Sequence, residues 1–215
     1  ALAWFVRKGE TTWFLAAWLI NGLECSNHLL GLLTAAGLAG WSVWLVRRRR
    51  ISRPALAAAG GLWLLGLAPY LYLGFDAWRD GMAPGAVVSS ILFGGEYRGA
   101  VLNVLPTGRM LLVSLGVIAL NFPTPNLLLV PLGLAAGRAR LDPNLRGLLI
   151  AVTVLHLVFA VRYPVPDQPT FFIIPVFFLA IWLAAGAAWL AERAPSLREA
   201  AVVFVLANPV LYHAL

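Results

Sequence analysis

The sequence predicts an all-α, polytopic transmembrane helical bundle, and three observations lead to that class. Hydrophobic residues make up 61% of the 215 residues and charged residues only 12%, whereas soluble domains carry about a quarter charged residues. The mean hydropathy is +0.84. Several apolar stretches approach the ~20 residues that a helix needs to cross the ~30 Å hydrocarbon layer of a membrane. So little polar surface excludes a soluble globular domain.

The positive charge of the chain is distributed as this class requires. The formal net charge is +7, and Lys and Arg concentrate in the cytoplasmic loops of membrane proteins. The segments that we assign to the cytoplasm hold 12 of the 16 Lys and Arg residues and four acids, and the outer segments hold four basic residues and five acids. This asymmetry explains the charge without a nucleic-acid partner, and the RRRR run at 47–50 is interpreted as a topological anchor at anionic lipid. We expect a multi-pass protein of a bacterial inner membrane with its basic loops in the cytoplasm.

The first apolar run, 11–46, is too long for one crossing, because its 36 residues would extend ~54 Å as a helix. Basic residues lie before and after it, so both of its ends belong on the cytoplasmic side. The run therefore predicts a hairpin of two helices, about 11–22 and 28–46, with the polar stretch NGLECSNH at its tip. The first arm is only about 18 Å long, so Glu24 and His28 are expected within or just below the outer interface.

The remaining segments follow from apolar length and from the basic loops between them. In chain order they are an outward helix at 55–74, a long outer loop at 75–109, an inward span at 110–137, a helix at 147–162, a short outer loop at 163–170, a helix at 171–190 and a seventh helix that begins near 200. The inward span is expected to break at NFPTPN, where two prolines remove backbone donors. We therefore expect about seven spans or part-spans in a single transmembrane domain, 1–215. Because the chain opens without Met and closes inside an apolar run, this domain is interpreted as a fragment of a longer chain.

The polar residues that are not assigned to the cytoplasm fall on one side of this topology. They form three clusters: Glu24, Asn27 and His28 at the hairpin tip; Asp76, Arg79, Asp80, Glu96, Tyr97 and Arg98 in the long loop; and Arg162, Tyr163, Asp167 and Gln168 in the short loop. Ionisable groups at membrane depth are costly and usually mark a pathway or a site. We therefore expect the three clusters to share one site at the outer face.

The hairpin tip admits two interpretations. Glu24 and His28 are spaced i, i+4 and would share a face if the tip stays helical, which would suit a hydroxyl, a phosphate or a sugar. Alternatively, the tip residues cap helix ends, and Asn27 is suited to capping a helix that begins at His28. A lone Glu and His lack the further ligands of a zinc site, so no metal is expected.

The outer arginines and Asp167 also admit a functional and a structural interpretation. The donor fork of Arg98 or Arg162 suits a phosphate, but pairing with a nearby carboxylate would explain these residues equally well. Asp167 lies among three prolines on a stiff loop, as a candidate catalytic carboxylate or a positioning residue. His156, in the middle of a predicted helix, is expected to be a packed interhelical donor. The spacing of Gly133 and Gly137 suggests a close approach between helices.

Five short motifs, taken in order, resemble a polytopic family catalogued as domain of unknown function 2723. The motifs are GLECSNHLLGLL, LAPYLYLGF, FGGEYRGAVL, NFPTPNLLLVPLGL and YPVPDQPTFFIIPVF, and together they cover roughly residues 11–190. That family is similar to the protein O-mannosyltransferases of the C-type glycosyltransferase fold. The resemblance implies transfer of a sugar from a polyprenyl-phosphate donor to an extracytoplasmic protein or glycan acceptor, with no cofactor.

The resemblance also implies which positions form the site. The positions carried over from the motifs are Asn27, His28, Tyr70, Tyr72, Tyr97, Arg98, Tyr163 and Asp167. Two family features are absent. An acidic motif in a first outer loop, which would supply the catalytic base, does not occur, so this fragment is expected to be inactive alone. FDAWRDGMAPG also replaces a Trp-Gly-Asp-Pro-like element, which leaves donor and acceptor specificity open.

The leading hypothesis is thus a membrane glycosyltransferase. Glu24 and Asp167 are the candidate catalytic residues present in the chain, while Arg98, Arg162 and Gln168 join the carried-over residues as substrate-binding candidates. The alternatives are a transporter or lipid-carrier flippase, which the broken helices also suit, and a non-catalytic membrane scaffold.

Overall fold

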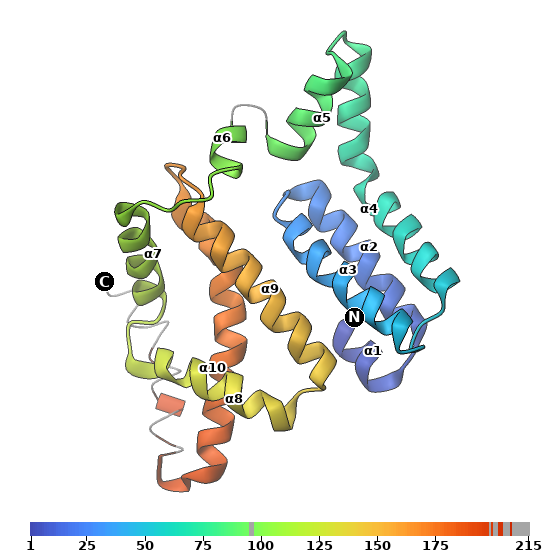
Figure 1. The fold of residues 1–215 in the computed structure, drawn as a ribbon. Coiled ribbons are helices and arrows are strands. Elements are labelled where there is room, and N and C mark those ends of the chain that lie inside the picture. The colour runs from blue at the N-terminus through green and yellow to red at the C-terminus, as the bar shows by residue number, and fades with distance from the viewer. Residues whose placement is uncertain (95–96, 198, 200–201, 204–206, 208–215) are drawn as a thin grey trace. The chain divides into compact units, whose positions relative to one another are not determined.

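The structure, a computed structural model, describes residues 1–94, 97–197, 199, 202–203 and 207. These described ranges contain helices and no strand, which confirms the all-α class. The chain divides into two compact units, Ala1–Leu102 (unit 1) and Asn103–Leu215 (unit 2). Figure 1 labels the helices along the chain. The single domain expected from the sequence stays a prediction.

Unit 1 begins with a short helix and a helical hairpin. They are α1, Leu2–Lys8; α2, Thr11–Asn27; and α3, Gly31–Arg47. The hairpin predicted at 11–46 is confirmed, but its expected turn was placed too early, because α2 continues to Asn27 instead of ending near residue 22. The polar residues do not break the helix, since the side chain of Asn21 donates to the carboxylate of Glu24 one turn later. The turn itself is only residues 28–30.

The next helix, α4, Arg53–Arg79, is the longest in unit 1. It begins at Ser52, whose hydroxyl accepts a hydrogen bond from the Ala55 N–H at 3.2 Å. Pro69 lies inside the helix, and Figure 1 shows α4 bending partway along its length. An interior proline removes one helical hydrogen bond and is a common cause of such a bend.

The prediction of one long outer loop at 75–109 is wrong. α4 continues to Arg79, and two further helices follow it: α5, Pro84–Phe93, and α6, Arg98–Val101. Pro84 suits the first turn of α5, where its missing N–H would have no partner, and Gly94, with φ +67, ends that helix. The scattered Gly, Pro and charged residues around α5 hid a short apolar helix of ten residues.

Two glycines bring α2 and α4 together, and these two helices form the most extensive contact in unit 1. A Cβ added to Gly66 would lie 2.7 Å from the carbonyl oxygen of Leu19, and one added to Gly22 would collide with the carbonyl oxygen of Trp63. Small residues let helix backbones approach closely in this way. The contact fixes the end of the hairpin against the middle of α4.

Unit 2 begins with a broken helix. Its parts are α7, Gly108–Asn121; the 3-10 helix η2, Pro125–Leu128; and α8, Leu129–Arg140. The two arms are bent by 104° at the break, so the predicted interruption at NFPTPN is confirmed. Phe122 follows the last turn of α7 and is buried in the core of this unit.

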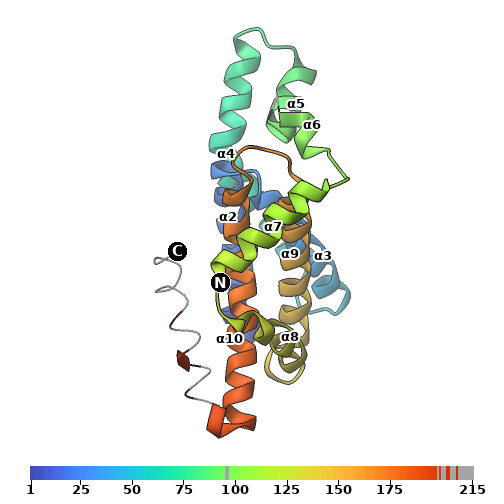
Figure 2. The ribbon, with the colours of Figure 1, turned by 90° about the vertical axis from the view of Figure 1, so that its left-hand side faces the viewer.

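The rest of unit 2 is an antiparallel pair of helices, α9, Pro143–Arg162, and α10, Ile173–Arg193, which lie alongside each other in Figures 1 and 2. The 3-10 helix η3, Gln168–Phe172, leads into α10, and a second, η4, Pro195–Leu197, follows it. The helices predicted at 147–162 and 171–190 are confirmed. The outer loop predicted at 163–170 is shorter, because the chain becomes helical again at Gln168.

A second pair of glycines joins α8 to α10. A Cβ on Gly133 would collide with the carbonyl oxygen of Trp182, and one on Gly186 with that of Leu129. The close approach expected from the glycine spacing is therefore confirmed at Gly133. Gly137 faces the Trp182 side chain instead, 3.3 Å from its nearest ring atom.

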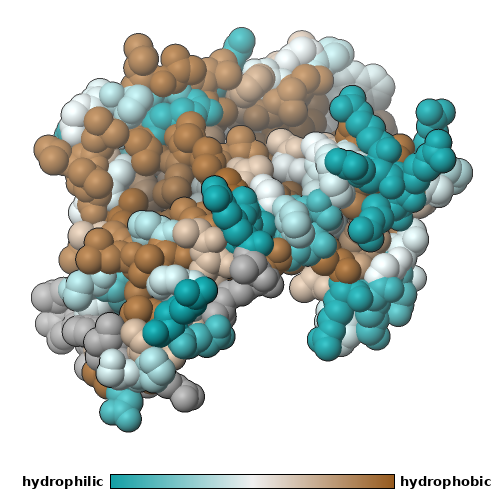
Figure 3. All heavy atoms as spheres, turned by 60° about the horizontal axis from the view of Figure 1, so that its bottom comes forward, coloured by the Kyte–Doolittle hydropathy of each residue, from teal (hydrophilic) through white to brown (hydrophobic). Residues whose placement is uncertain are grey.

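Among the residues that the structure describes, three helical segments are long and apolar enough to cross a membrane, Arg53–Arg79, Pro143–Arg162 and Gln168–Arg193, and the bent pair α7–α8 would make a fourth. The hairpin arms have 17 residues each, about 25 Å, and fall short of a full crossing. The seventh helix expected from near 200 falls largely outside the described residues. Hydrophobic residues dominate the face drawn in Figure 3, as they do on a surface that contacts lipid.

Candidate functional site

A buried amide organises the hairpin tip. Asn21 is only 2% exposed, and its Nδ2 donates to Oε2 of Glu24 at 2.9 Å and to the carbonyl oxygen of Gly31 at 3.0 Å. Its Oδ1 accepts a hydrogen bond from Nε1 of Trp63 at 3.1 Å. The amide thus joins α2 to both α3 and α4, and a buried polar group is stable only when it is paired in this manner.

A second polar contact fastens the same tip to α4. The hydroxyl of Ser26 donates to the carbonyl oxygen of Gly66 at 2.8 Å, one turn beyond the Gly22 contact. Cys25, between these residues, is fully buried. The last turn of α2 is therefore packed and hydrogen-bonded on its buried side. These contacts fix the position of the side chains on its exposed side.

The outward side chains of the tip are those that the sequence singled out. Glu24 is half-buried, and Asn27 and His28 are exposed. Nδ1 of His28 accepts a hydrogen bond from the Leu30 N–H at 3.1 Å, just before α3 begins at Gly31. The prediction that Asn27 caps a helix starting at His28 is therefore wrong, because Asn27 is the last residue of α2 and α3 begins only at Gly31, without a side-chain cap.

The condition for a shared face of Glu24 and His28, a helical tip, is met up to Asn27. The His28 N–H still donates to the carbonyl oxygen of Glu24, four residues earlier, at 2.8 Å. His28 itself has an extended backbone, with φ −153 and ψ 129, and ends α2.

The depth of this tip along α4 is its most informative property. The tip contacts α4 at Trp63 and Gly66, and Gly66 lies 13 residues from either end of that helix, Arg53 and Arg79. Thirteen residues correspond to about 20 Å of helix. The Glu24 carboxylate, which shares the Asn21 amide with Trp63, therefore lies near the middle of a candidate span, and ionisable groups at membrane depth are costly and usually functional.

The C-terminal half of α4 forms a cavity with α5. Its volume is about 120 Å³, and it is lined by Tyr70, Leu73, Gly74, Ala77, Met82, Val87, Ser90 and Ile91. The hydroxyl of Tyr70 donates to the carbonyl oxygen of Ile91 at 3.2 Å, which joins the two helices. Tyr72 lies on another face of α4 and is 62% exposed. The structure thus separates the two tyrosines, one in a helix contact and one at the surface.

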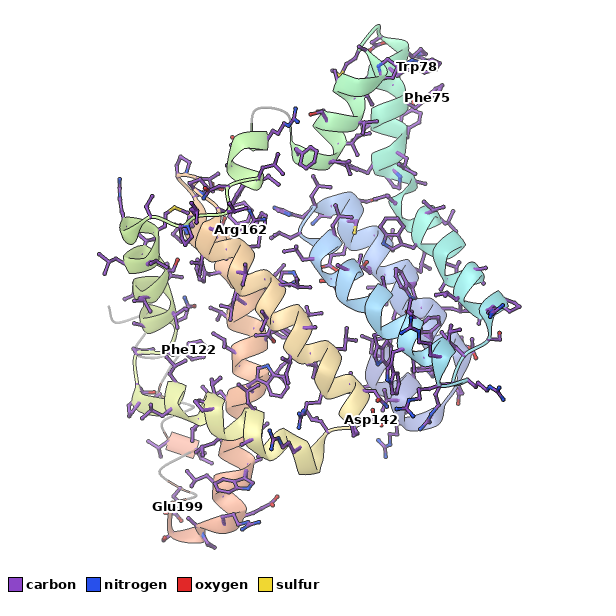
Figure 4. The ribbon with its side chains drawn as sticks, in the orientation of Figure 1. Phe75, Trp78, Phe122, Asp142, Arg162 and Glu199 are labelled. Carbon is purple, nitrogen blue, oxygen red and sulfur yellow. The ribbon has the colours of Figure 1, made fainter. Side chains whose placement is uncertain are left out.

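Arg98 and Tyr97 lie at the start of α6. The guanidinium carbon of Arg98 lies 5.8 Å from the centroid of the Phe93 ring, and Tyr97 is 54% exposed. At the end of α4, Phe75 and Trp78 point away from α5 (Figure 4), with ring centroids 5.7 Å apart. These exposed rings at one end of a candidate span suit the aromatic belt that membrane proteins place at the interface.

In unit 2, Arg162 ends α9 (Figure 4) and is held by Asn103. The guanidinium of Arg162 donates to the carbonyl oxygen of Asn103, and Nδ2 of Asn103 donates to the carbonyl oxygen of Arg162 at 2.7 Å. The guanidinium also lies over the ring of Phe159, 5.4 Å from its centroid. These contacts fix the position of the guanidinium at the end of α9.

Tyr163 and Gln168 have structural partners in the same unit. Tyr163 is buried and packs against Phe159 and Phe171, with ring centroids 4.8 and 4.7 Å away. Nε2 of the buried Gln168 donates to the carbonyl oxygen of Ala160 at 2.9 Å, which caps α9. The aromatic cluster and this cap fix the loop that carries Asp167.

Asp167 is exposed, and its backbone carbonyl accepts hydrogen bonds from the N–H and the hydroxyl of Thr170. Its carboxylate is thus presented on a stiff turn. His156 is buried, and its Nδ1 lies 2.9 Å from the carbonyl oxygen of Val152 in its own helix. Its ring packs against Phe178 of α10, which confirms the expected packing between helices, while the hydrogen bond of Nδ1 stays within α9.

The structure gathers the predicted residues within each unit. In unit 1 the tip holds Glu24, Asn27 and His28, and in unit 2 the α9–α10 turn holds Arg162, Tyr163, Asp167 and Gln168. The expectation that the tip residues and the residues of the α9–α10 turn form one site stays a prediction. Sequence reasoning missed Trp63 and Asn103 as partners, because neither stands out in its segment.

No family model, no curated protein and no solved structure matches this chain. The resemblance to the domain of unknown function 2723 family therefore rests on the five sequence motifs. Function is inferred below from the placement of the polar groups. Among the described residues, no three His, Cys, Asp or Glu side chains gather as metal ligands would.

Proposed function

We propose that the protein is a membrane glycosyltransferase, which transfers a mannose-like sugar from a polyprenyl-phosphate donor to an extracytoplasmic acceptor. One observation carries this proposal. The α2–α3 hairpin packs on Gly66 in the middle of α4, and its tip, with Glu24, Asn27 and His28, ends a short distance beyond that contact. A lipid-linked sugar has its polar head at the boundary of the membrane, so polar protein groups that receive it belong at such a level.

The tip supplies groups of the kind that sugar transfer needs. Transfer to a hydroxyl requires a base to remove its proton, and Glu24 and Asp167 are the candidates within the chain. Glu24 is oriented by Asn21, which donates to one of its carboxylate oxygens and leaves the other oxygen available. The exposed Asn27 and His28 beside it can bond the hydroxyls of a sugar.

The donor leaves as a lipid phosphate, and its charge needs stabilisation in the transition state. Arg98 and Arg162 are the candidates, because each guanidinium is held over an aromatic ring, Phe93 and Phe159 respectively. A pre-positioned planar guanidinium suits a phosphate better than a flexible ammonium does.

A transporter remains the second candidate, and one observation favours it. The arms α7 and α8 are bent by 104° at NFPTPN, and the buried Asn126 lies at that bend. Broken helices of this kind line substrate sites in transporters. A transporter would move the lipid carrier or its sugar without forming a new glycosidic bond.

The proposal is tested by sugar transfer in membranes that contain the intact protein. The donor is radiolabelled polyprenyl-phosphate mannose, and the measurement is label that becomes covalently attached to protein or glycan. Glu24→Gln and Asp167→Asn are compared with Glu199→Gln, an exposed acid in unit 2 (Figure 4).

Loss of the general base is expected to lower the transfer rate by about 10²- to 10⁴-fold, while Glu199→Gln keeps the full rate. Movement of the labelled lipid across the membrane without sugar transfer would contradict the glycosyltransferase proposal and support the transporter. Full activity in both Glu24→Gln and Asp167→Asn would remove these two residues from catalysis.

A further inference from the structure

One end of unit 1, which we call the basic end, concentrates positive charge. It consists of the end of α1 and the turn between α3 and α4, and its cationic residues are Arg7, Lys8, Arg47, Arg48, Arg49, Arg50 and Arg53. Phe5 of α1 packs edge-on against Trp41 of α3, with ring centroids 5.7 Å apart, and Ile51 of the turn is buried. These contacts hold both segments together. In Figure 3, hydrophilic side chains stand out from the hydrophobic surface at this end.

Tryptophan rings order several of these cations. Nζ of Lys8 lies 4.7 Å from the centroid of the Trp4 ring, and the guanidinium carbon of Arg48 lies 5.7 Å from that of Trp44. Trp4 is itself stacked on Trp13, at 5.8 Å and 23°. A cation held on a ring is stabilised by the π system and keeps its N–H donors. It therefore loses less conformational freedom when it binds an anion.

The charge of the basic end has no internal counterpart. Within the part of the chain that the structure describes, none of its seven cations forms an ion pair with a carboxylate. The one acid in this region, Glu10, accepts a hydrogen bond from Nε1 of Trp13 at 3.1 Å. All seven cations are exposed, so they are accessible to an anion from outside the chain.

The backbone of the turn between α3 and α4 places Arg49 in a strained conformation. Arg49 has φ +55, a left-handed conformation at the end of α3 in which helices usually place Gly. The N–H groups of Arg49 and Arg50 donate to the carbonyl oxygens of Val46 and Leu45, both at 2.9 Å. A β-carbon is strained in this conformation, so a charged side chain is kept where Gly would be more stable.

We propose that the basic end is a binding surface for the phosphate groups of anionic phospholipids in the leaflet that it faces. A lipid is favoured over a soluble anion because the candidate span α4 begins within this end, at Arg53. Trp residues also lie beside the cations, and in membrane proteins Trp marks the level of the headgroups. We therefore expect this surface to bind anionic phospholipids more tightly than neutral ones. This binding is separate from the effect of the same arginines on the orientation of the protein in the membrane.

Native mass spectrometry of the protein in neutral detergent tests this proposal, with phosphatidylglycerol and phosphatidylcholine as probes. Each basic residue at an anionic surface contributes a factor of about five to binding. Arg48→Gln/Arg50→Gln is therefore expected to weaken phosphatidylglycerol binding about 25-fold. The matched control, Arg79→Gln/Arg109→Gln, removes the same charge elsewhere and is expected to leave binding unchanged.

Arg49→Gly separates binding from stability. It should weaken phosphatidylglycerol binding about fivefold and raise the melting temperature in lipid-free detergent, because Gly relieves the left-handed backbone. Equal binding of the two lipids, or equal weakening by the test and control pairs, would overturn the proposal. Tighter binding of a short RNA than of phosphatidylglycerol would assign the surface to nucleic acid instead.

Discussion

At the scale of single residues, Asn21 shows how a hydrophobic chain buries a polar side chain by pairing it with hydrogen-bond partners. The sequence makes the burial of Asn21 and Glu24 conspicuous, but it does not show that one amide bonds to groups of three helices. The partners Glu24, Gly31 and Trp63 are separated along the chain, and only the close contact of α2 with α4 brings them together. The end of α2 at Asn27 was missed for a related reason, since helix ends are hard to place from sequence.

Asn21→Leu is expected to lower the free energy of unfolding by about 1–3 kcal/mol, because it leaves the Trp63 indole and the Gly31 carbonyl without their buried partner. Asn27→Leu, at the exposed end of the same helix, is the control and should change stability by less than about 0.5 kcal/mol. Reversible unfolding in mixed micelles measures both. Equal losses in the two variants would show that the amide network does not fasten the tip.

At the scale of elements, both units pair two helices through glycines and attach a third through an indole. In unit 1, Nε1 of Trp18 donates to the hydroxyl of Ser42 at 3.2 Å, and in unit 2 Nε1 of Trp182 donates to the hydroxyl of Thr153 at 3.1 Å. Trp18 precedes Gly22 by four residues, and Trp182 precedes Gly186 by the same spacing. The tryptophan-bearing helix comes first in unit 1 and last in unit 2, so this similarity is not a sequence repeat.

Gly22→Ala is expected to destabilise the protein by about 1–3 kcal/mol, because the added methyl collides with the backbone of α4 and helix backbones yield little. Gly40→Ala, in the open middle of α3 with no atom within 4 Å, should stabilise the protein by about 0.5–1 kcal/mol. Thermal unfolding in detergent provides the comparison. A stabilising Gly22→Ala would contradict the close α2–α4 contact.

Apolar length and the prolines predicted most of the helices, and the structure confirms those at α4, α9 and α10 and the break between α7 and α8. Helix α5 was missed, because its ten apolar residues, Pro84–Phe93, are too few for a crossing and lie between stretches rich in Gly, Pro and charge. The hairpin turn was placed too early, because polar residues were expected to interrupt a helix that their own hydrogen bonds support.

At the scale of the whole molecule, the central claim is that the hairpin tip and the α9–α10 turn face the same, non-cytoplasmic side. The sequence supports this claim through the distribution of Lys and Arg. The structure adds that the tip ends beside the middle of a candidate span. Asn27, an exposed amide next to that contact, would need a polar surrounding within a membrane.

Cysteine labelling of intact cells tests this claim most directly. In a Cys25→Ala background, Asn27→Cys and Asp167→Cys report the two turns, and Arg49→Cys reports the opposite end of unit 1. A membrane-impermeant maleimide is predicted to label Asn27→Cys and Asp167→Cys from outside intact cells. It is predicted to label Arg49→Cys only after the membrane is permeabilised. Labelling of Asn27→Cys and Asp167→Cys from opposite sides would contradict the claim.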